Sequence, residues 1–180
     1  KTIIPIEISN RTEYEYANRD ISGWLQSVEN KKIAVEALAK IEKLKQLSAR
    51  VKLTSIIEWI ENFIEQNIDD KLVIMCTHHE TIDELQKYFP NISVKLDGRD
   101  SAEQKQKAVE LFQTDNNIKL FIGNIKAAGV GITLTAASNL CFCEFAWSPG
   151  EMLQAEDRIH RIGQKECCNI YYFVGKDTID

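Results

Sequence analysis

The sequence contains no long hydrophobic run. Its longest uninterrupted one, Leu72–Cys76, is far shorter than the roughly 20 apolar residues that span a bilayer, so we expect no transmembrane segment and no membrane partner. Residues 1–8 lack the continuous apolar stretch and the small-residue cleavage site of a signal peptide. The first residue is not methionine and the last residues form no tail or cap, so we expect the chain to be part of a longer protein.

Glycine and proline are scarce. The 180 residues include 8 Gly and 3 Pro, which excludes collagen-like, fibrous and linker-dominated classes. Hydrophobic residues make up 44% of the chain and charged residues 27%, a composition typical of globular proteins. A chain of this length fits one domain with a substantial core.

The cysteines form no recognisable framework. Their number, 5, is odd, and the pairs Cys141-x-Cys143 and Cys167-Cys168 fit neither a set of disulfides nor the C-x2-C pairs of zinc sites. We interpret them as reduced core thiols of a cytosolic or nuclear protein, and we expect no metal site.

Positive charge is not in excess. The chain has 22 Lys and Arg against 27 Asp and Glu, a net charge of −5. By itself, this balance argues against non-specific attraction to nucleic acid, because phosphates require cationic partners.

The first 70 residues read as a lead-in strand followed by helices. Residues 3–8 alternate weakly and contain Pro5, which indicates an edge strand or an extended segment. The pattern is then helical as far as Gln66, with two apolar stripes and a break near residues 49–51. A coiled coil is one alternative, but the first stripe is short and rich in Ala, which favours a surface that pairs with a larger fold.

From Lys71 onward, short β-type runs alternate with amphipathic helices. The expected strands are Leu72–Thr77, Ile92–Leu96, Ile118–Gly123, Leu140–Phe145 and Ile170–Val174. The expected helices are Thr81–Tyr88, Ala102–Phe112, a short one near Lys126–Ala128, and Met152–Ile162. This order predicts an α/β fold, a doubly wound parallel sheet with helices on both faces. In such a sheet ligands bind beyond the carboxyl ends of the strands.

Residues 154–164 read Gln-Ala-Glu-Asp-Arg-Ile-His-Arg-Ile-Gly-Gln. On a helix Gln154, Arg158 and Arg161 share one face. Two neighbouring guanidinium groups repel each other unless an anion lies between them, and the donor fork of Arg suits phosphate oxygens. One interpretation is therefore a pair of arginine fingers directed at the γ-phosphate of a nucleotide. The other is surface pairing with Glu156 and Asp157.

This segment resembles helicase motif VI of SWI/SNF-type DNA translocases. Residues 127–138, Ala-Ala-Gly-Val-Gly-Ile-Thr-Leu-Thr-Ala-Ala-Ser, resemble motif V of the same family. Residues 71–79 are similar to motif IV, and residues 96–99 to the next conserved block. The order and separations match over residues 71–175, and Phe145-x-Trp147-x-Pro149-Gly150 is most similar to the annealing-helicase branch.

The resemblance implies the second RecA-like lobe of a two-lobe ATPase over residues 71–180, with residues 1–70 as an inter-lobe strand and helical extension. The phosphate loop G-x-x-x-x-G-K-[ST] is absent from the sequence. ATP and Mg²⁺ are therefore expected mainly on the N-terminal RecA-like lobe of the same protein, and the isolated chain is expected to be inactive. The implied partner is double-stranded or branched DNA, and the implied location is the nucleus, or the cytoplasm and nucleoid in a bacterium.

Site residues carry over from the motifs by position. The resemblance implies catalytic roles for Arg158, Arg161 and Gln154, and nucleotide contacts for Gly129 and Gly131 together with the two arginines. It implies DNA contacts at strand ends for Thr77, His78, Gly98, Arg99, Asn124, Lys126 and Thr133. The family commonly has Ser or Thr where this chain has Arg99 and near Asn124.

Two other functions stay open at this point. One is an RNA helicase lobe of the DEAD-box type, whose motif VI usually continues with Arg where this chain has Gln164. The other is a non-catalytic RecA-like interaction module. His160 and Trp147 are expected to serve in packing or inter-motif contacts rather than in catalysis.

Overall fold

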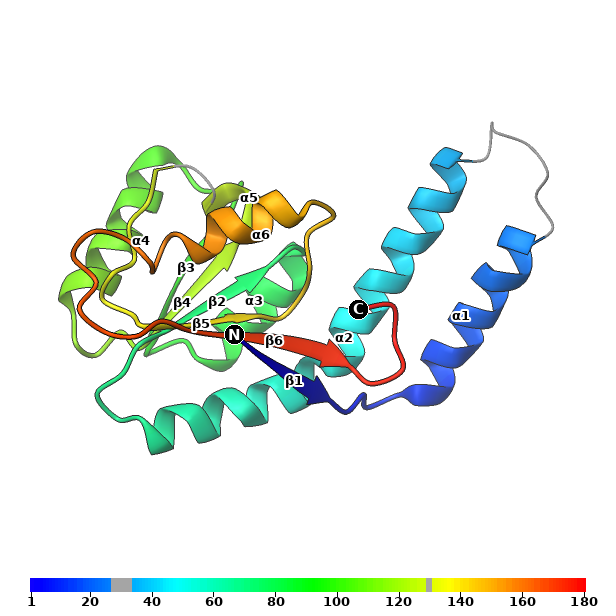
Figure 1. Ribbon diagram of the computed structural model, residues 1–180, viewed down its shortest axis with the longest axis horizontal. Helices are drawn as coiled ribbons and strands as arrows, with labels where there is room; N and C mark the ends of the chain where they lie inside the picture. The colour runs from blue at the N-terminus through cyan, green and yellow to red at the C-terminus, as the bar shows by residue number, and fades with distance from the viewer. Residues whose placement is uncertain (27–33, 129–130) are drawn as a thin grey trace.

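The computed structural model describes residues 1–26, 34–128 and 131–180. In it, six parallel strands form one sheet with the order β1-β6-β5-β2-β4-β3 (Figure 1). The strands are β1 Thr2–Ile6, β2 Leu72–Cys76, β3 Ser93–Leu96, β4 Leu120–Asn124, β5 Asn139–Phe142 and β6 Asn169–Gly175. The helices are α1 Arg11–Gln26, α2 Ala34–Gln66, α3 His79–Tyr88, α4 Ala102–Thr114, α5 Ile125–Ala128 and α6 Pro149–Glu156.

The predicted parallel α/β sheet is confirmed. Each expected run contains a strand, with ends that shift by a few residues. β1 is an edge strand that pairs only with β6, where the missing amide hydrogen of Pro5 is tolerated. The three strands β2, β4 and β5 are buried along their whole length, as expected for a parallel sheet covered on both faces.

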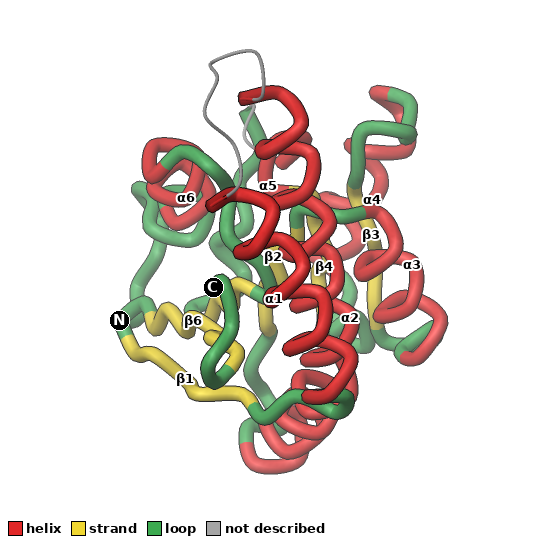
Figure 2. Tube along the Cα trace, turned by 90° about the vertical axis from the view of Figure 1, so that its right-hand side faces the viewer, coloured by secondary structure: helices red, strands yellow, loops and turns green. Residues whose placement is uncertain are grey.

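The core lies on both faces of the sheet. One face packs against the second half of α2 and against α3, with Ile56, Ile60 and Ile82 in its core. The other face packs against α4, α5 and α6, with Phe112 and Ala155 in its core. Figure 2 shows α1 and α2 in front of the strands when the molecule is turned by 90°. Alternate residues of β2 point to opposite faces, which is the period of two that an extended strand imposes.

α2 is one helix of 33 residues, so the expected break near residues 49–51 is wrong. The apolar stripe changes there because the helix changes what it packs against. Its second half lies on the sheet, whereas its first half projects beyond the sheet and packs beside α1 (Figure 1). Tyr14, Ile21, Leu44 and Val51 form the small apolar cluster between these two helices.

The cysteines are all free thiols, but not all of them lie in the core. Cys76, Cys141 and Cys143 are buried, whereas Cys167 is exposed and Cys168 half-buried. The prediction of core thiols is therefore wrong for Cys167, which lies in the turn before β6. Within the described ranges, no helix is long and apolar enough to cross a membrane.

Shortening a side chain between α2 and the sheet should destabilise the protein. Ile60 is 0% exposed, whereas Ile68, just beyond the same helix, is 74% exposed. Ile60→Ala should lower the free energy of unfolding by about 2–5 kcal/mol, because it removes buried methyl groups and leaves a cavity. Urea denaturation measures this change. The matched control, Ile68→Ala, should change stability by less than about 0.5 kcal/mol, and equal losses in the two variants would contradict the packing.

Candidate functional site

The carboxyl ends of the central strands are joined by side-chain hydrogen bonds. Asn124, the last residue of β4, donates from Nδ2 to the carbonyl oxygen of Thr77 at 2.8 Å. Its Oδ1 accepts from the backbone N–H groups of Lys126 and Ala127, at 3.0 and 3.2 Å. Asn124 therefore fixes the end of β4 to the end of β2 and begins the short helix α5, a local use typical of Asn.

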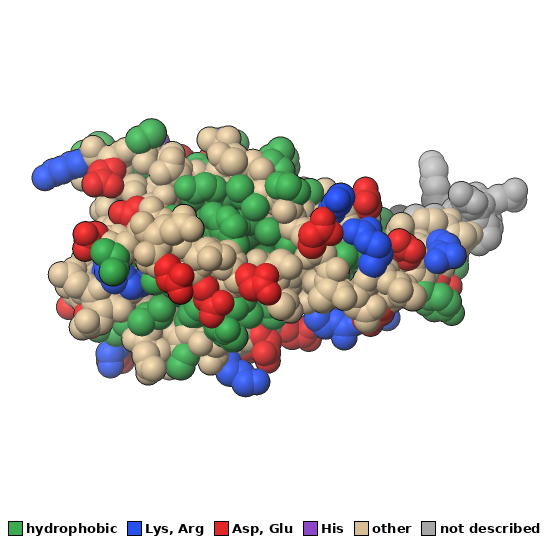
Figure 3. All heavy atoms as spheres, turned by 90° about the horizontal axis from the view of Figure 1, so that it is seen from below, with side chains coloured by type: hydrophobic (Ala, Val, Ile, Leu, Met, Phe, Trp, Pro, Cys, Tyr) green, Lys and Arg blue, Asp and Glu red, His purple; other side chains and the backbone are tan. Residues whose placement is uncertain are grey.

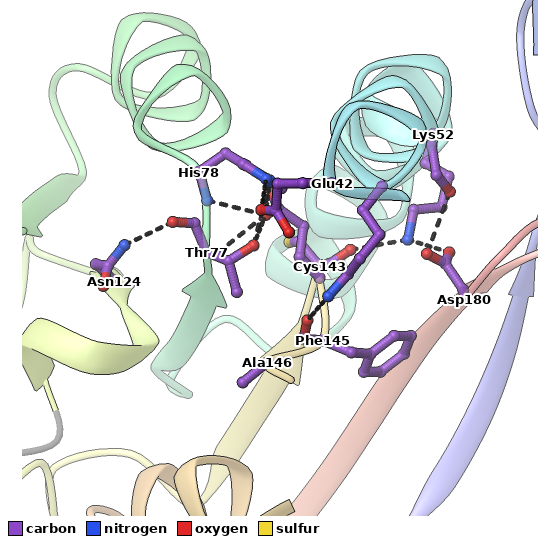
Figure 4. Close-up of polar contacts among 12 residues, drawn as sticks. Glu42, Lys52, Thr77, His78, Asn124, Cys143, Phe145, Ala146 and Asp180 are labelled. Atoms are coloured by element: carbon purple, nitrogen blue, oxygen red, sulfur yellow. Dashed lines mark hydrogen bonds and ion pairs between the residues drawn. The ribbon is translucent and has the colours of Figure 1, made fainter. Parts of the chain in front are cut away.

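A buried carboxylate links the ends of β2 and β5. Glu144, two residues after β5, accepts at Oε2 from the backbone N–H groups of Thr77 and His78, at 3.0 and 2.9 Å. The Thr77 hydroxyl and His78 Nδ1 contact the same oxygen. The second ring nitrogen of His78, Nε2, lies 3.0 Å from Oε1 of Glu42 on α2. Figure 4 shows Thr77, His78 and Glu42 meeting at this point.

The pKa values follow from this arrangement. Burial by itself raises the pKa of Glu144, but the hydrogen bonds and charge of His78 and the Thr77 hydroxyl lower it to about 2. The hydrogen bond from Glu144 raises the pKa of His78 above its ordinary 6.5, against the effect of burial, and Glu42 adds to the rise. The pair is therefore an ion pair at the pH where histidine normally loses its proton.

These contacts bear on the expected DNA ligands. The hydroxyl of Thr77 and both ring nitrogens of His78 are occupied within the protein, and so is the side chain of Asn124. The structure gives all three residues a role in holding strand ends together. Their predicted contacts to phosphate stay predictions, and in the structure these side chains have partners within the protein.

Arg99 likewise has internal partners. Its guanidinium donates to both carboxylate oxygens of Asp83, at 2.8 and 2.6 Å, and also binds the buried Asp97. The hydrogen bonds from Arg99 hold the pKa of Asp97 well below its usual range. The predicted Arg99 contact to DNA stays a prediction, and in the structure its guanidinium pairs with two carboxylates. Gly98 is exposed in the same turn.

The helix expected over Met152–Ile162 ends at Glu156, so Arg158 and Arg161 do not continue one face of a helix with Gln154. Beyond Glu156, backbone hydrogen bonds join residues three apart instead of four, as from Arg158 N to Ala155 O at 3.1 Å. Two features accompany the end of the α-helix. The carbonyl of Arg158 accepts from Leu134 N at 2.9 Å, and Gly163 adopts φ +109°.

The two arginines nevertheless lie beside the same loop. Arg158 is buried, and its Nη1 donates to the carbonyl of Ile132 at 3.3 Å. Arg161 is exposed, and its Nη1 lies 3.0 Å from the hydroxyl of Thr133. Burial lowers the pKa of Arg158, and the positive charge of Arg161 lowers it further, so the two cations are close enough to repel each other.

The remaining predicted residues surround this loop. Gly131 has φ +73°, a left-handed conformation that suits glycine, whereas Gly129 lies outside the described residues. Gln154 is exposed in the last turn of α6. Lys126 is exposed at the start of α5, and it forms no ion pair within the described part of the chain. Those same ranges contain no group of three His, Cys, Asp or Glu that could hold a metal ion.

Known proteins show which family has this arrangement. Residues 52–163 match the Helicase conserved C-terminal domain. The chain belongs to this family. It is 37% identical over 139 residues to the SWI/SNF-related matrix-associated actin-dependent regulator of chromatin subfamily A-like protein 1 homolog of Caenorhabditis elegans, covering 74% of this chain and 20% of that protein. It is 44% identical over 87 residues to the DNA annealing helicase and endonuclease ZRANB3 of Homo sapiens, covering 48% of this chain and 8% of that protein.

Solved structures agree with this assignment. The C-terminal part of the Fun30 ATPase domain superposes with a TM-score of 0.65 at 26% identity, covering 73% of this chain and 44% of that one. The SWI2/SNF2 ATPase core domain of Sulfolobus solfataricus gives 0.79 at 21% identity, covering 97% of this chain and 39% of that one, and shows the shared fold. The chain is the RecA-like C-terminal lobe of a SNF2-type helicase, as its motifs indicated. It spans a fifth or less of the two curated relatives.

Sequence reasoning missed the residues that hold the site together. Glu144 is the one charged residue in the otherwise apolar run Leu140–Phe145, and such a position signals a buried ion pair. Lys52 is 0% exposed and lies where the apolar stripe of α2 is interrupted. Glu42 carries no comparable signal, because a glutamate in an amphipathic helix is ordinarily solvated.

The ion pair predicts how stability depends on pH. Because the pKa of His78 is raised above 6.5, its contribution is fully present below pH 6.5 and is lost as the pH rises through the folded value. Glu144 has the opposite sign: its pKa is lowered from 4.5 to about 2, so its contribution is present above pH 4.5 and is lost as the pH falls toward 2. The pair should therefore stabilise the protein most between these limits.

Urea denaturation at a series of pH values tests this expectation. The free energy of unfolding should decline above pH 6.5 in the wild type and decline less in His78→Gln, which cannot gain the proton. His160→Gln, which changes an exposed histidine, should keep the wild-type profile. Identical profiles for His78→Gln and the wild type would show that the pair adds nothing.

Proposed function

We propose that the chain is the C-terminal motor lobe of an ATP-dependent translocase on double-stranded DNA, of the annealing-helicase branch. Residues 71–180 act as the lobe and residues 1–70 as the segment that joins it to an N-terminal lobe. The observation that carries the proposal is the juxtaposition of two like charges, Arg158 and Arg161, beside the loop 131–134. Similarity to a DNA annealing helicase supports the branch.

The arginine pair fits a phosphate group. Two guanidinium groups that repel each other gain from an anion placed between them, and phosphate accepts their paired donors. Bound ATP with Mg²⁺ supplies the phosphoryl group that is transferred to water. In this protein Arg158 is held by the fold, whereas Arg161 is exposed and able to leave Thr133. Arg161 thus stabilises charge on the γ-phosphate, Arg158 contacts the same phosphate group from a position fixed by the fold, and Gln154 helps to orient the nucleotide or the attacking water.

DNA contacts are expected to be few. Of the predicted ligands, Lys126 and the backbone at Gly98 are exposed, whereas the other side chains would first exchange a contact within the protein, namely those of Thr77, His78, Arg99, Asn124 and Thr133. Positioning contacts to DNA come largely from amides, hydroxyls and cations. Figure 3 shows basic and acidic side chains interspersed on one face of the molecule, with no continuous basic strip there. With a net charge of −5, this lobe alone should bind DNA weakly, and the N-terminal lobe should supply most of the affinity. The relatives are chromatin and DNA proteins by name, which supports a nuclear location.

Removing Arg161 tests the catalytic role. In the full-length protein, Arg161→Ala should lower DNA-stimulated ATP turnover by about 10³-fold or more, because an arginine finger contributes 10³ to 10⁵ to the rate. A phosphate-release assay with saturating duplex DNA measures this, and the isolated chain should show no turnover. Lys165→Ala removes an exposed positive charge nearby and should keep wild-type turnover. Arg161→Ala with more than about a tenth of the activity would exclude the finger role.

Salt dependence tests the DNA contacts. Fluorescence anisotropy with a labelled duplex should show weak binding by the 180-residue chain that falls further as salt rises. Lys126→Ala should reduce the slope of log affinity against log salt by about one, the value for one phosphate contact. Lys107→Ala, which removes an exposed lysine of α4, should leave the slope unchanged. Tight binding at physiological salt, or equal slopes in both variants, would contradict the assignment, and stimulation of the full-length ATPase by RNA alone would favour an RNA helicase.

A further inference from the structure

The connection between β5 and α6, residues 143–148, lies along α2. Lys52 Nζ donates to the carbonyl of Cys143 at 2.9 Å, and Lys45 Nζ donates to the carbonyl of Phe145 at 2.7 Å. The indole N–H of Trp147 donates to Glu42 Oε2 at 2.8 Å. Residues 143, 145 and 147 of the connection thus contact residues 52, 45 and 42 of the helix, in that order. The connection therefore runs antiparallel to the helix.

The contacting residues form one polar stripe on α2. Glu42, Lys45 and Lys52 are separated by three and seven residues, which places them on a single side of the helix. Figure 4 shows Glu42 and Lys52 on the side of α2 that faces Cys143 and Phe145. The polar stripe takes the place of the apolar stripe where α2 extends beyond the edge of the sheet. Its specific hydrogen bonds therefore hold the connection in one position, which hydrophobic contact alone does less well.

Lys52 anchors one end of the stripe. Its ammonium is 0% exposed and donates to the carbonyls of Cys143 and Phe173 and to the carboxylate of Asp180. A buried ammonium is costly without partners, but here its three donor hydrogens match three acceptors. The end of β5 and the end of β6 are thereby fixed to the same residue of α2.

Glu42 is the junction at the other end. One carboxylate oxygen contacts His78 Nε2 at 3.0 Å and the other accepts from Trp147. The ammonium of Lys45, one turn along the helix, lies 4.5 Å from the centre of the Trp147 ring. Trp147 is 53% exposed, so these two contacts, rather than burial, set its position. Glu42 therefore joins the end of β2 to the segment that leads into α6.

We propose that the middle of α2, residues 42–52, positions the β5–α6 connection, with Glu42 as the positioning residue that couples it to the end of β2. The effect of this positioning on ATP turnover rests on the proposed function. α6 begins directly after the connection and leads within two residues of its end to Arg158. A shift of the connection therefore moves the segment that carries the arginines, and small misplacements of catalytic groups lower turnover steeply.

The position of Trp147 tests the proposal without any activity. The 180-residue chain, labelled with 5-fluorotryptophan, contains three tryptophans, and Trp147→Phe assigns the ¹⁹F resonance of Trp147. Glu42→Ala should shift and narrow this resonance and leave those of Trp24 and Trp59 in place. Glu65→Ala, the same change at an exposed position of α2, should move none of them. An unmoved Trp147 resonance in Glu42→Ala, or an equal shift in Glu65→Ala, would overturn the proposal.

Turnover in the full-length protein tests the consequence. Glu42→Ala should lower kcat for DNA-stimulated ATP hydrolysis by about tenfold and change KM for ATP by less than about twofold, since the N-terminal lobe holds the nucleotide. Glu65→Ala should match the wild type. Wild-type turnover in Glu42→Ala would overturn the proposal. A wild-type protein without ATPase activity would overturn the proposed function instead, and the ¹⁹F result would still decide the positioning role.

A double-mutant cycle covers the case in which Glu42→Ala does not fold. Glu42→Gln replaces the carboxylate with a neutral amide, which weakens the hydrogen bond from the indole, and Trp147→Phe keeps an aromatic ring but removes the N–H. Their effects on thermal stability should be smaller together than the sum of the single effects, because both act on the same hydrogen bond. Additive effects would show that Glu42 and Trp147 are not coupled and would overturn the proposal.

Discussion

The buried carboxylate of Glu144 organises the carboxyl edge of the sheet. A carboxylate at this depth needs hydrogen-bond donors, and Thr77 and His78 provide them from the end of β2 to one of its oxygens, Oε2. The requirement brings the end of β2 against the end of β5 and orients the His78 ring. That orientation aims the second ring nitrogen at Glu42, so the same buried charge is linked through His78 to α2.

The use of cations inside the protein changes what the net charge means. Lys52 and Lys71 are buried donors to backbone carbonyls, and Arg99 forms ion pairs with Asp83 and Asp97. In the structure these cations are engaged within the protein. The positive charge available at the candidate site is therefore smaller than the 22 Lys and Arg suggest, and it is concentrated at residues such as Arg161 and Lys126. On the proposed function, this lobe should therefore need a partner surface to act on DNA.

Much of the fold could be predicted because hydrophobic periodicity reports local geometry. The buried strands β2, β4 and β5 are short apolar runs bounded by polar residues, and the sequence pattern predicts all three. The continuity of α2 and the end of α6 were not predicted, since both depend on tertiary contacts. Ser48 and Lys52 interrupt an apolar stripe but bind Asp180 and the strand ends, and the turn after Glu156 follows from the bond between Leu134 and Arg158.

In the candidate site, too, some features could be predicted from the sequence and others depend on tertiary structure. The motifs located Arg158 and Arg161 because spacing and residue type are visible in a sequence. Their unequal exposure was not visible, because the backbone turns after Glu156 and places one guanidinium inward and the other outward. This inequality has a physical consequence. A buried arginine held by the carbonyl of Ile132 keeps its position at little further entropic cost, whereas an exposed arginine retains the freedom to follow a ligand. The pair therefore combines one fixed and one mobile charge, which an evenly exposed helical face would not provide.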